Sequence, residues 1–188
     1  QAGISGAYFG KIMEDLDQKN RLTNFEIDED LEVETWWDLG MNDSTVITFA
    51  QRFGDEIRII DCYENSGEGL EHYLNVIDDK PYKYSKHIAP HDIRVREIGT
   101  NKSRWETAKE LGLEFDIAPK LSIEDGIEQV RRMLPKCYFH KNNCKKLIEA
   151  LKSYCKRWDE KNNCFRNKPL HNWASHFCDS VRYGAIVE

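Results

Sequence analysis

The sequence predicts an α/β fold in which a mixed β-sheet is flanked by helices. Strand-like segments follow one another at residues 32–38, 44–53 and 56–64, and Gly54-Asp55 between the last two is a strong hairpin signal. Helical and strand-like segments then alternate along the rest of the chain. These observations predict an antiparallel three-strand meander plus parallel strands, with helices on both faces and a β-hairpin before the C-terminal helix.

Local signals justify the elements on either side of the meander. A helix is expected over residues 5–19, and an acidic lead-in connects it to the first strand. After the meander, two glycines precede a helix at residues 70–79, which Pro81 closes. A strand at residues 84–89 then runs into the tetrapeptide Ala-Pro-His-Asp.

Serine caps mark two helices in the second half of the chain. One starts at Ser103 and stops at Gly112, and the next starts at Ser122, where Ser-x-x-Asp forms an N-terminal cap. The remaining expected elements are strands at 113–118 and 137–140, a helix at 142–154, a hairpin at 154–168 and a last helix from about Ala174.

Length and composition limit the class of protein. With 188 residues and 40% hydrophobic content, we expect one domain over residues 1–188, with the helix and acidic lead-in at 1–30 and the hairpin at 154–168. No apolar run approaches the roughly 20 residues that span a bilayer, so a soluble protein is expected. The six cysteines are scattered, which favours reduced thiols in a cytoplasm. A start at Gln1 suggests a processed product or a piece of a longer chain.

Charge is distributed unevenly along the chain. The net charge is −6, yet residues 136–170 hold ten bases and three acids. Such a patch suits phosphate binding, and a solvated lysine-rich surface explains it equally well. The candidate DNA-binding residues in this segment are Lys145, Lys146, Lys152, Lys156, Arg157, Lys161, Arg166 and Lys168.

Three aspartates are candidates for one site. Asp38 and Asp92 each follow a predicted strand, and Asp179 lies in the last helix among apolar residues. If the strands at 32–38 and 84–89 are neighbours, their ends bring two carboxylates together and a crossing helix adds the third. Taken singly, Asp38 or Asp92 is more typical of a turn or a cap, and Asp179 also fits a salt bridge to Arg182.

Clustered carboxylates predict a metal site. Carboxylates packed together repel one another and must take up protons or bind cations, and oxygen-only ligands select hard ions such as Mg²⁺ or Mn²⁺. Two such ions, about 3.5 to 4 Å apart, can activate a water and stabilise the leaving oxygen of a phosphodiester. No Cys-x-x-Cys pair supports zinc, and no GxxxxGK[ST] motif is present, so any ATP-driven work would belong to another domain.

The motifs TWWDLGMNDSTVI, IAPHDIR and LHNWASHFCDSVRYGA, in this order and spacing, resemble the nuclease domain of the large terminase subunit of tailed bacteriophages. That family has a ribonuclease H-like fold. The resemblance implies that Asp38, Asp92 and Asp179 bind one or two divalent metals and that the domain is an endonuclease cutting concatemeric double-stranded phage DNA. It also implies that His176 orients Asp179 or contacts the scissile phosphate, and that the hairpin at 154–168 lies near the active site.

The partners that the resemblance implies are double-stranded DNA, an ATPase domain of the same polypeptide, the portal protein and the small terminase subunit. It places the protein in the host cell cytoplasm, with no membrane partner. The chain departs from the family at Asn172, where many relatives have Asp. Asp43 is then an alternative outer ligand, although a cap at the hairpin entry is the better interpretation. His91, before the second acid, either touches a phosphate or caps the strand end.

Other interpretations remain open. Another ribonuclease H-like nuclease, such as a Holliday-junction resolvase or a transposase core, would use the same acids on branched or end-specific DNA. A catalytically idle docking module of a packaging motor would use none of them. Among the five tryptophans, Trp158 in the basic hairpin is the candidate for stacking on bases, and core packing is expected for the other four.

Overall fold

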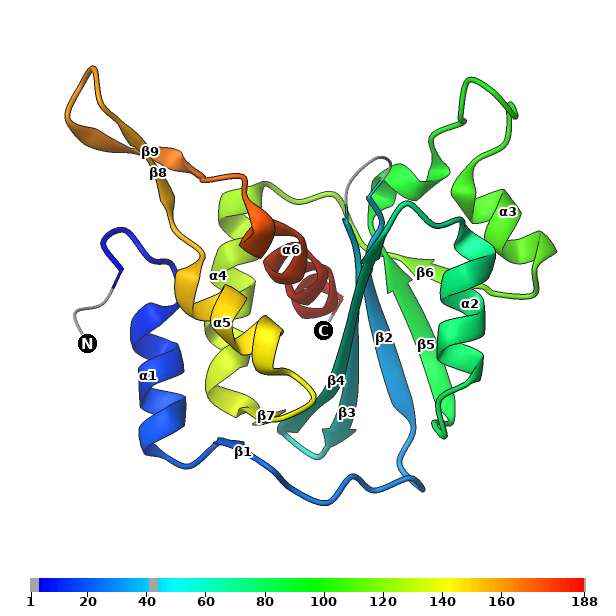
Figure 1. Cartoon of the computed structure of the whole chain (residues 1–188), viewed down its shortest axis with the longest axis horizontal. Helices are drawn as coiled ribbons and strands as arrows, with labels where there is room; N and C mark the ends of the chain where they lie inside the picture. The colour runs from blue at the N-terminus through cyan, green and yellow to red at the C-terminus, as the bar shows by residue number, and fades with distance from the viewer. Residues whose placement is uncertain (1–3, 41–43, 188) are drawn as a thin grey trace.

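The computed structural model describes residues 4–40 and 44–187 of the chain. Its largest feature is a seven-stranded sheet with the strand order β1-β7-β4-β3-β2-β5-β6 (Figure 1). The strands are β1 (Leu22–Thr23), β2 (Val33–Asp38), β3 (Ser44–Phe53), β4 (Glu56–Ser66), β5 (Tyr84–Ala89), β6 (Phe115–Ile117) and β7 (Cys137–His140). Strands β2, β3 and β4 pair antiparallel, and every other pairing in this sheet is parallel. The predicted meander with added parallel strands is confirmed.

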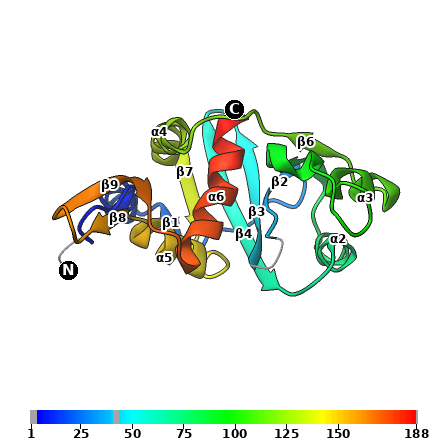
Figure 2. The ribbon, with the colours of Figure 1, turned by 90° about the horizontal axis from the view of Figure 1, so that it is seen from above.

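Helices cover both faces of the sheet, as expected. They are α1 (Gly10–Gln18), α2 (Leu70–Asp78), α3 (Arg104–Glu110), α4 (Ile123–Met133), α5 (Lys145–Ser153) and α6 (Trp173–Ile186), with 3₁₀ turns η1 (His91–Arg94) and η2 (Leu134–Lys136). Helices α1, α4, α5 and α6 lie on one face, and α2 and α3 lie on the other (Figure 2). No helix in the described part of the chain is long and apolar enough to cross a membrane.

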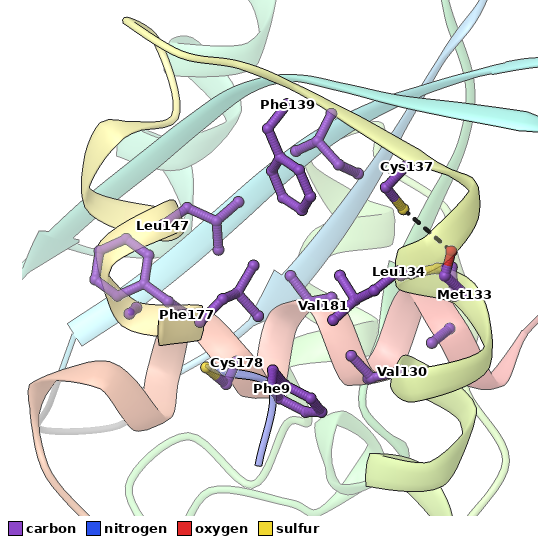
Figure 3. Packing of buried hydrophobic residues seen from close by; sticks show 14 of the residues in the cluster. Phe9, Val130, Met133, Leu134, Cys137, Phe139, Leu147, Phe177, Cys178 and Val181 are labelled. Atoms are coloured by element: carbon purple, nitrogen blue, oxygen red, sulfur yellow. Dashed lines mark hydrogen bonds between the residues drawn. The ribbon is translucent and has the colours of Figure 1, made fainter. Parts of the chain in front are cut away.

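Each face of the sheet has its own apolar core, and β2 contributes to both. Because side chains alternate along a strand, Trp36 packs under α6 while its neighbour Trp37 packs on the side of α2 and α3. Both indoles are fully buried. On the α6 side, Phe177 and Val181 meet residues of α4, α5 and β7 (Figure 3). Packing on both faces of the sheet therefore holds the end of β2 in place.

Helix α6 lies very close to the sheet. The hydroxyl groups of Ser180 and Thr48 form a buried hydrogen bond of 2.8 Å between the helix and β3. Gly184 faces Trp36, and a Cβ atom at this position would lie only 2.0 Å from the indole. Glycine is therefore required at position 184 for the observed contact between helix and strand.

The expected hairpin before the last helix is present as β8 (Lys156–Asp159) and β9 (Cys164–Pro169), which form a separate two-stranded sheet. It extends away from the body of the molecule (Figure 1). Trp158 and Phe165 face each other across it, with ring centroids 4.8 Å apart. Asn163 in the turn takes a φ of +47°, a conformation that asparagine tolerates better than most residues.

Two features near the start of the chain differ from the sequence prediction. The first helix begins at Gly10, because residues before it form a turn and a bridge from Ala7 to Cys155. Strand β1 was not predicted, because its two residues carry no periodic signal and its parallel pairing with β7 is long-range. All six cysteines are free thiols, as expected from their spacing.

Candidate metal centre

Asp38 is the last residue of β2 and lies at the carboxyl edge of the sheet. Its carboxylate Oδ2 lies 2.9 Å from Nδ1 of His176, and the two side chains are only 13% and 15% exposed. Burial raises the pKa of Asp38 to about 6, the hydrogen bond from His176 opposes that rise, and the charge of Asp179 adds to it. Asp38 is thus a buried acid held by one histidine.

Asp179 reaches the same place from α6. Asn172 caps this helix, since its side chain accepts from the Ala174 N–H while the Ser175 hydroxyl accepts from the Asn172 N–H. From this start, His176 and Asp179 fall three residues apart and share one side of the helix. The sequence departure at Asn172 therefore has a structural role as a helix cap.

Arg182 is the partner of Asp179, at 3.1 Å between Nη2 and Oδ1. Its side chain crosses Gly126 of α4, where a Cβ atom would lie 2.6 Å from Cδ of Arg182. Burial raises the pKa of Asp179, and Arg182 opposes that rise more strongly than any other neighbour. The salt bridge allowed by the sequence is therefore present, and it lies beside a second buried acid.

Asp92 occupies a different environment. It lies in η1, directly after β5, the parallel neighbour of β2. Asp92 is exposed and lines an open pocket of about 840 Å³. Burial raises the pKa of Tyr183, and the charges of Asp179, Asp38 and Asp92 add to that rise.

The donor set fits a hard divalent cation. Asp38 and Asp179 offer oxygen ligands only, and the raised pKa of each is the electrostatic state that a bound cation would relieve. Over residues 4–40 and 44–187, however, no three His, Cys, Asp or Glu side chains converge closely enough to hold an ion. The structure brings Asp38 and Asp179 together, and the three-acid set stays a prediction. Asp43 lies outside the described residues.

The histidines are placed differently from one another. His176 contacts Asp38, whereas the resemblance suggested Asp179 or the scissile phosphate. His91 is exposed at the start of η1. His171, which the sequence did not single out, packs edge-on against His176 at 5.4 Å and contributes to the field at Asp179. Its place just before the helix cap is the signal that could have identified it.

One tryptophan was wrongly predicted to pack in the core. Trp173 is 45% exposed at the first turn of α6. Trp158 is 47% exposed in the hairpin, as expected. A position in a helix could not by itself predict the exposure of Trp173, because the burial of each helical residue depends on how the helix packs on the sheet.

Solved structures supply the comparison for this site, whereas no family model and no curated protein matches the sequence. The nuclease domain of the phage P22 large terminase is similar over 100% of this chain and 94% of its own, with 18% identity and a TM-score of 0.66. The large terminase nuclease domain of bacteriophage SPP1 with bound Mn matches over 81% and 84%, with 16% identity and a TM-score of 0.60. The large terminase of a thermophilic bacteriophage in complex with ATP-γ-S matches at 19% identity and a TM-score of 0.70.

The chain has the fold of a large-terminase nuclease domain. The mixed sheet flanked by helices that the sequence predicts is confirmed with it. The match to the thermophilic phage terminase covers 93% of this chain and 44% of the terminase chain, so this chain spans less than half of that protein.

Within this terminase nuclease fold, the predicted DNA-binding residues fall on two elements. Helix α5 carries Lys145, Lys146 and Lys152, and the β8–β9 hairpin with its turn carries Lys156, Arg157, Lys161, Arg166 and Lys168. Two of these residues have carboxylate partners: Lys146 pairs with Glu64, and Arg166 pairs with Asp159 at 2.9 Å. The hairpin also contributes the exposed ring pair of Trp158 and Phe165.

Proposed function

We propose that this chain is the divalent-metal-dependent DNA endonuclease domain of a viral genome-packaging terminase, which cuts concatemeric double-stranded DNA. The observation that carries the proposal is the pair of part-buried carboxylates, Asp38 at the carboxyl end of β2 and Asp179 in α6, within a terminase nuclease fold. The SPP1 nuclease domain of the same fold contains bound Mn. The charge of Asp179 adds to the raised pKa of Asp38, and a bound cation would offset this repulsion.

Asp38 and Asp179, together with Asp92 at the neighbouring surface, would hold one or two Mg²⁺ or Mn²⁺ ions. Such ions, when bound, supply an activated water and offset the charge that develops on the leaving oxygen. His176 holds the Asp38 carboxylate in one orientation, and Arg182 does the same for Asp179. Asp38 and Asp179 are therefore each held in position by a hydrogen-bonding or cationic neighbour.

Lysines and arginines of α5 and the hairpin would hold the phosphate backbone beside the acids, with His91 as a further phosphate contact. Contacts of this kind carry little base information, so low sequence preference is expected. The thermophilic phage terminase was solved with ATP-γ-S, and it has length beyond the matched part. We therefore place the ATPase activity in another domain of the same polypeptide, with the portal protein and the small terminase subunit as further partners.

The test is nicking of supercoiled plasmid in Mg²⁺ or Mn²⁺. Asp38→Asn and Asp179→Asn should each reduce the rate by about 100-fold or more, the usual effect of removing one preorganised electrostatic group. Asp55→Asn is the matched control, because Asp55 is exposed in the β3–β4 turn at the far end of these strands from Asp38. Nicking that survives either core substitution, or that ignores EDTA, would refute the proposal.

A substrate panel separates this proposal from the alternatives. A terminase nuclease should cut linear duplex at least as well as a four-way junction, whereas a resolvase or a transposase core should prefer branched DNA or specific ends. A docking module would cut neither substrate with either metal. Cleavage confined to the junction would reassign the same acids to a resolvase.

A further inference from the structure

A short arm lies on the opposite side of the acid pair from the hairpin. It consists of residues 94–102, from the last residue of η1 to the segment before α3, and its backbone is closed by hydrogen bonds. The Glu97 N–H donates to the Lys102 carbonyl and the Asn101 N–H donates to the Glu97 carbonyl, both at 2.9 Å, and Arg96 bridges to Ser103. The arm is therefore a defined small hairpin with its own hydrogen bonds.

Arg104 ties the base of this arm to the candidate site. Its Nη1 donates to the carbonyl of Leu39 at 2.8 Å, one residue beyond Asp38, and its Nε lies 3.3 Å from Glu97 in the arm. The 840 Å³ pocket is lined by Arg96 from the arm and by Asp92 from η1. Arg104 thus links the arm to the residue after Asp38, and the arm and Asp92 line one pocket.

Two arginines of the arm present their charge to solvent. Arg94 and Arg96 are both exposed, and neither has a carboxylate within 4.0 Å among the residues that the structure places. By contrast, Lys102 pairs with Glu110 at 2.8 Å. The guanidinium of Arg94 lies over the ring of Trp105, 5.7 Å from its centroid.

The arm and the β8–β9 hairpin extend past the same edge of the sheet, the edge at which β2 ends (Figure 1). Seen from above, they lie at opposite ends of the molecule, with α6 between them (Figure 2). Helix α6 carries His176 and Asp179. A ligand that spans from the hairpin to the arm therefore crosses α6, the helix that carries Asp179.

We propose that the 94–102 arm is a second DNA-contacting element, in which Arg94 and Arg96 bind phosphates of the duplex. The duplex then lies across Asp38 and Asp179, held on one side by the hairpin and on the other by the arm. This inference rests on the proposed function for its substrate. Unpaired guanidinium groups beside a candidate nuclease site favour a polyanion over a protein partner, although the exposed Ile98 at the tip offers an apolar surface as well.

The test measures binding of a labelled linear duplex across a range of salt concentrations, in an Asp38→Asn background that prevents cutting. Arg94→Ala/Arg96→Ala should weaken binding at least severalfold and reduce the slope of log K against log salt by up to about 1.8, since each phosphate contact contributes about 0.9. Arg94→Lys/Arg96→Lys should retain most of the slope, which excludes misfolding as the cause. Lys19→Ala/Arg132→Ala is the matched control, because it removes two exposed charges at the C-terminal ends of α1 and α4.

An unchanged slope in the arginine-to-alanine variant would overturn the inference and assign the arm, with Ile98, to a protein partner. Plasmid nicking by the unmodified chain is measured in parallel. It tests the proposed nuclease function independently of the arm. A chain that cuts, but whose arm variant binds and cuts normally, refutes the arm alone. A chain that never cuts, but whose arm variant loses binding, refutes the nuclease and retains the arm as a DNA contact.

Discussion

Replacing Gly184 by alanine tests whether the close packing of α6 on β2 positions the acid pair. The added Cβ would lie 2.0 Å from Cδ2 of Trp36, whereas ordinary contact begins at 3.4 Å, so helix and strand must separate by about 1.4 Å. Trp36 has no room to yield, because it is fully buried and its Nε1 donates to Glu34 at 3.1 Å. The displacement therefore falls on α6.

The expected cost is about 1 to 3 kcal/mol of unfolding free energy, the usual penalty for overpacking a core. This loss should appear even though alanine normally stabilises a helix interior by about 1 kcal/mol relative to glycine. A second effect follows from the residues that the helix carries, which include His176 and Asp179. A shift of about 1 Å in a catalytic group can cost about 100-fold in rate, so nicking should fall more than stability alone explains.

Urea unfolding and plasmid nicking in Mn²⁺ measure the two effects. Gly69→Ala is the matched control, because Gly69 has a φ of −78° and a Cβ there meets nothing within 4 Å. In the double variant Gly184→Ala/Trp36→Phe, the smaller ring should recover part of the loss, so that the two substitutions are less than additive. A Gly184→Ala protein that is as stable as the parent and cuts at the parent rate would refute the reasoning.

Two further predictions concern stability against pH and DNA binding. Burial lowers the pKa of His87 from 6.5 to about 4, so between these values the unfolded chain binds a proton that the folded chain does not. The unfolding free energy that depends on neutral His87 is therefore fully present above about pH 6.5, and it falls as the pH drops toward 4, by at most about 3 kcal/mol. The variant His87→Gln should flatten this part of the profile of urea-unfolding free energy against pH. An unchanged profile would contradict the prediction. Lys156→Ala/Arg157→Ala in the hairpin should weaken duplex binding and reduce the salt slope by up to about 1.8 in anisotropy titrations. A slope equal to that of the parent would exclude the hairpin as a contact surface.

Much of the fold follows from local signals that packing reinforces. The Gly54-Asp55 turn predicts the pairing of β3 with β4, and Gly54 indeed takes a φ of +61°. Ser103 predicts the start of α3 and forms a full capping box with Glu106. In these places the same few residues determine the local structure, so the sequence is sufficient.

Long-range features are less accessible. Strand β1 exists because residues 22 and 23 meet β7 in parallel, a pairing fixed by chain segments more than a hundred residues apart. The contact between His176 and Asp38 likewise joins a helix to a strand across the sheet, and no spacing in the sequence encodes it. The predicted strand ends and the last helix indicated the three acids, and the resemblance implied their role as metal ligands, whereas their separate environments depend on the packing of α6.

The candidate site divides into two acids fixed by the core and one acid at the surface. Asp38 follows two tryptophans that pack into opposite layers, and Asp179 precedes Ser180, whose hydroxyl is bonded to β3. Asp92 lies instead in a 3₁₀ turn in which Ile93 is the buried residue. Moving Asp38 or Asp179 would disturb a packed layer, whereas moving Asp92 requires only a change in η1. If the three carboxylates bind one ion, Asp92 therefore moves with η1, while Asp38 in the sheet and Asp179 in α6 keep their positions.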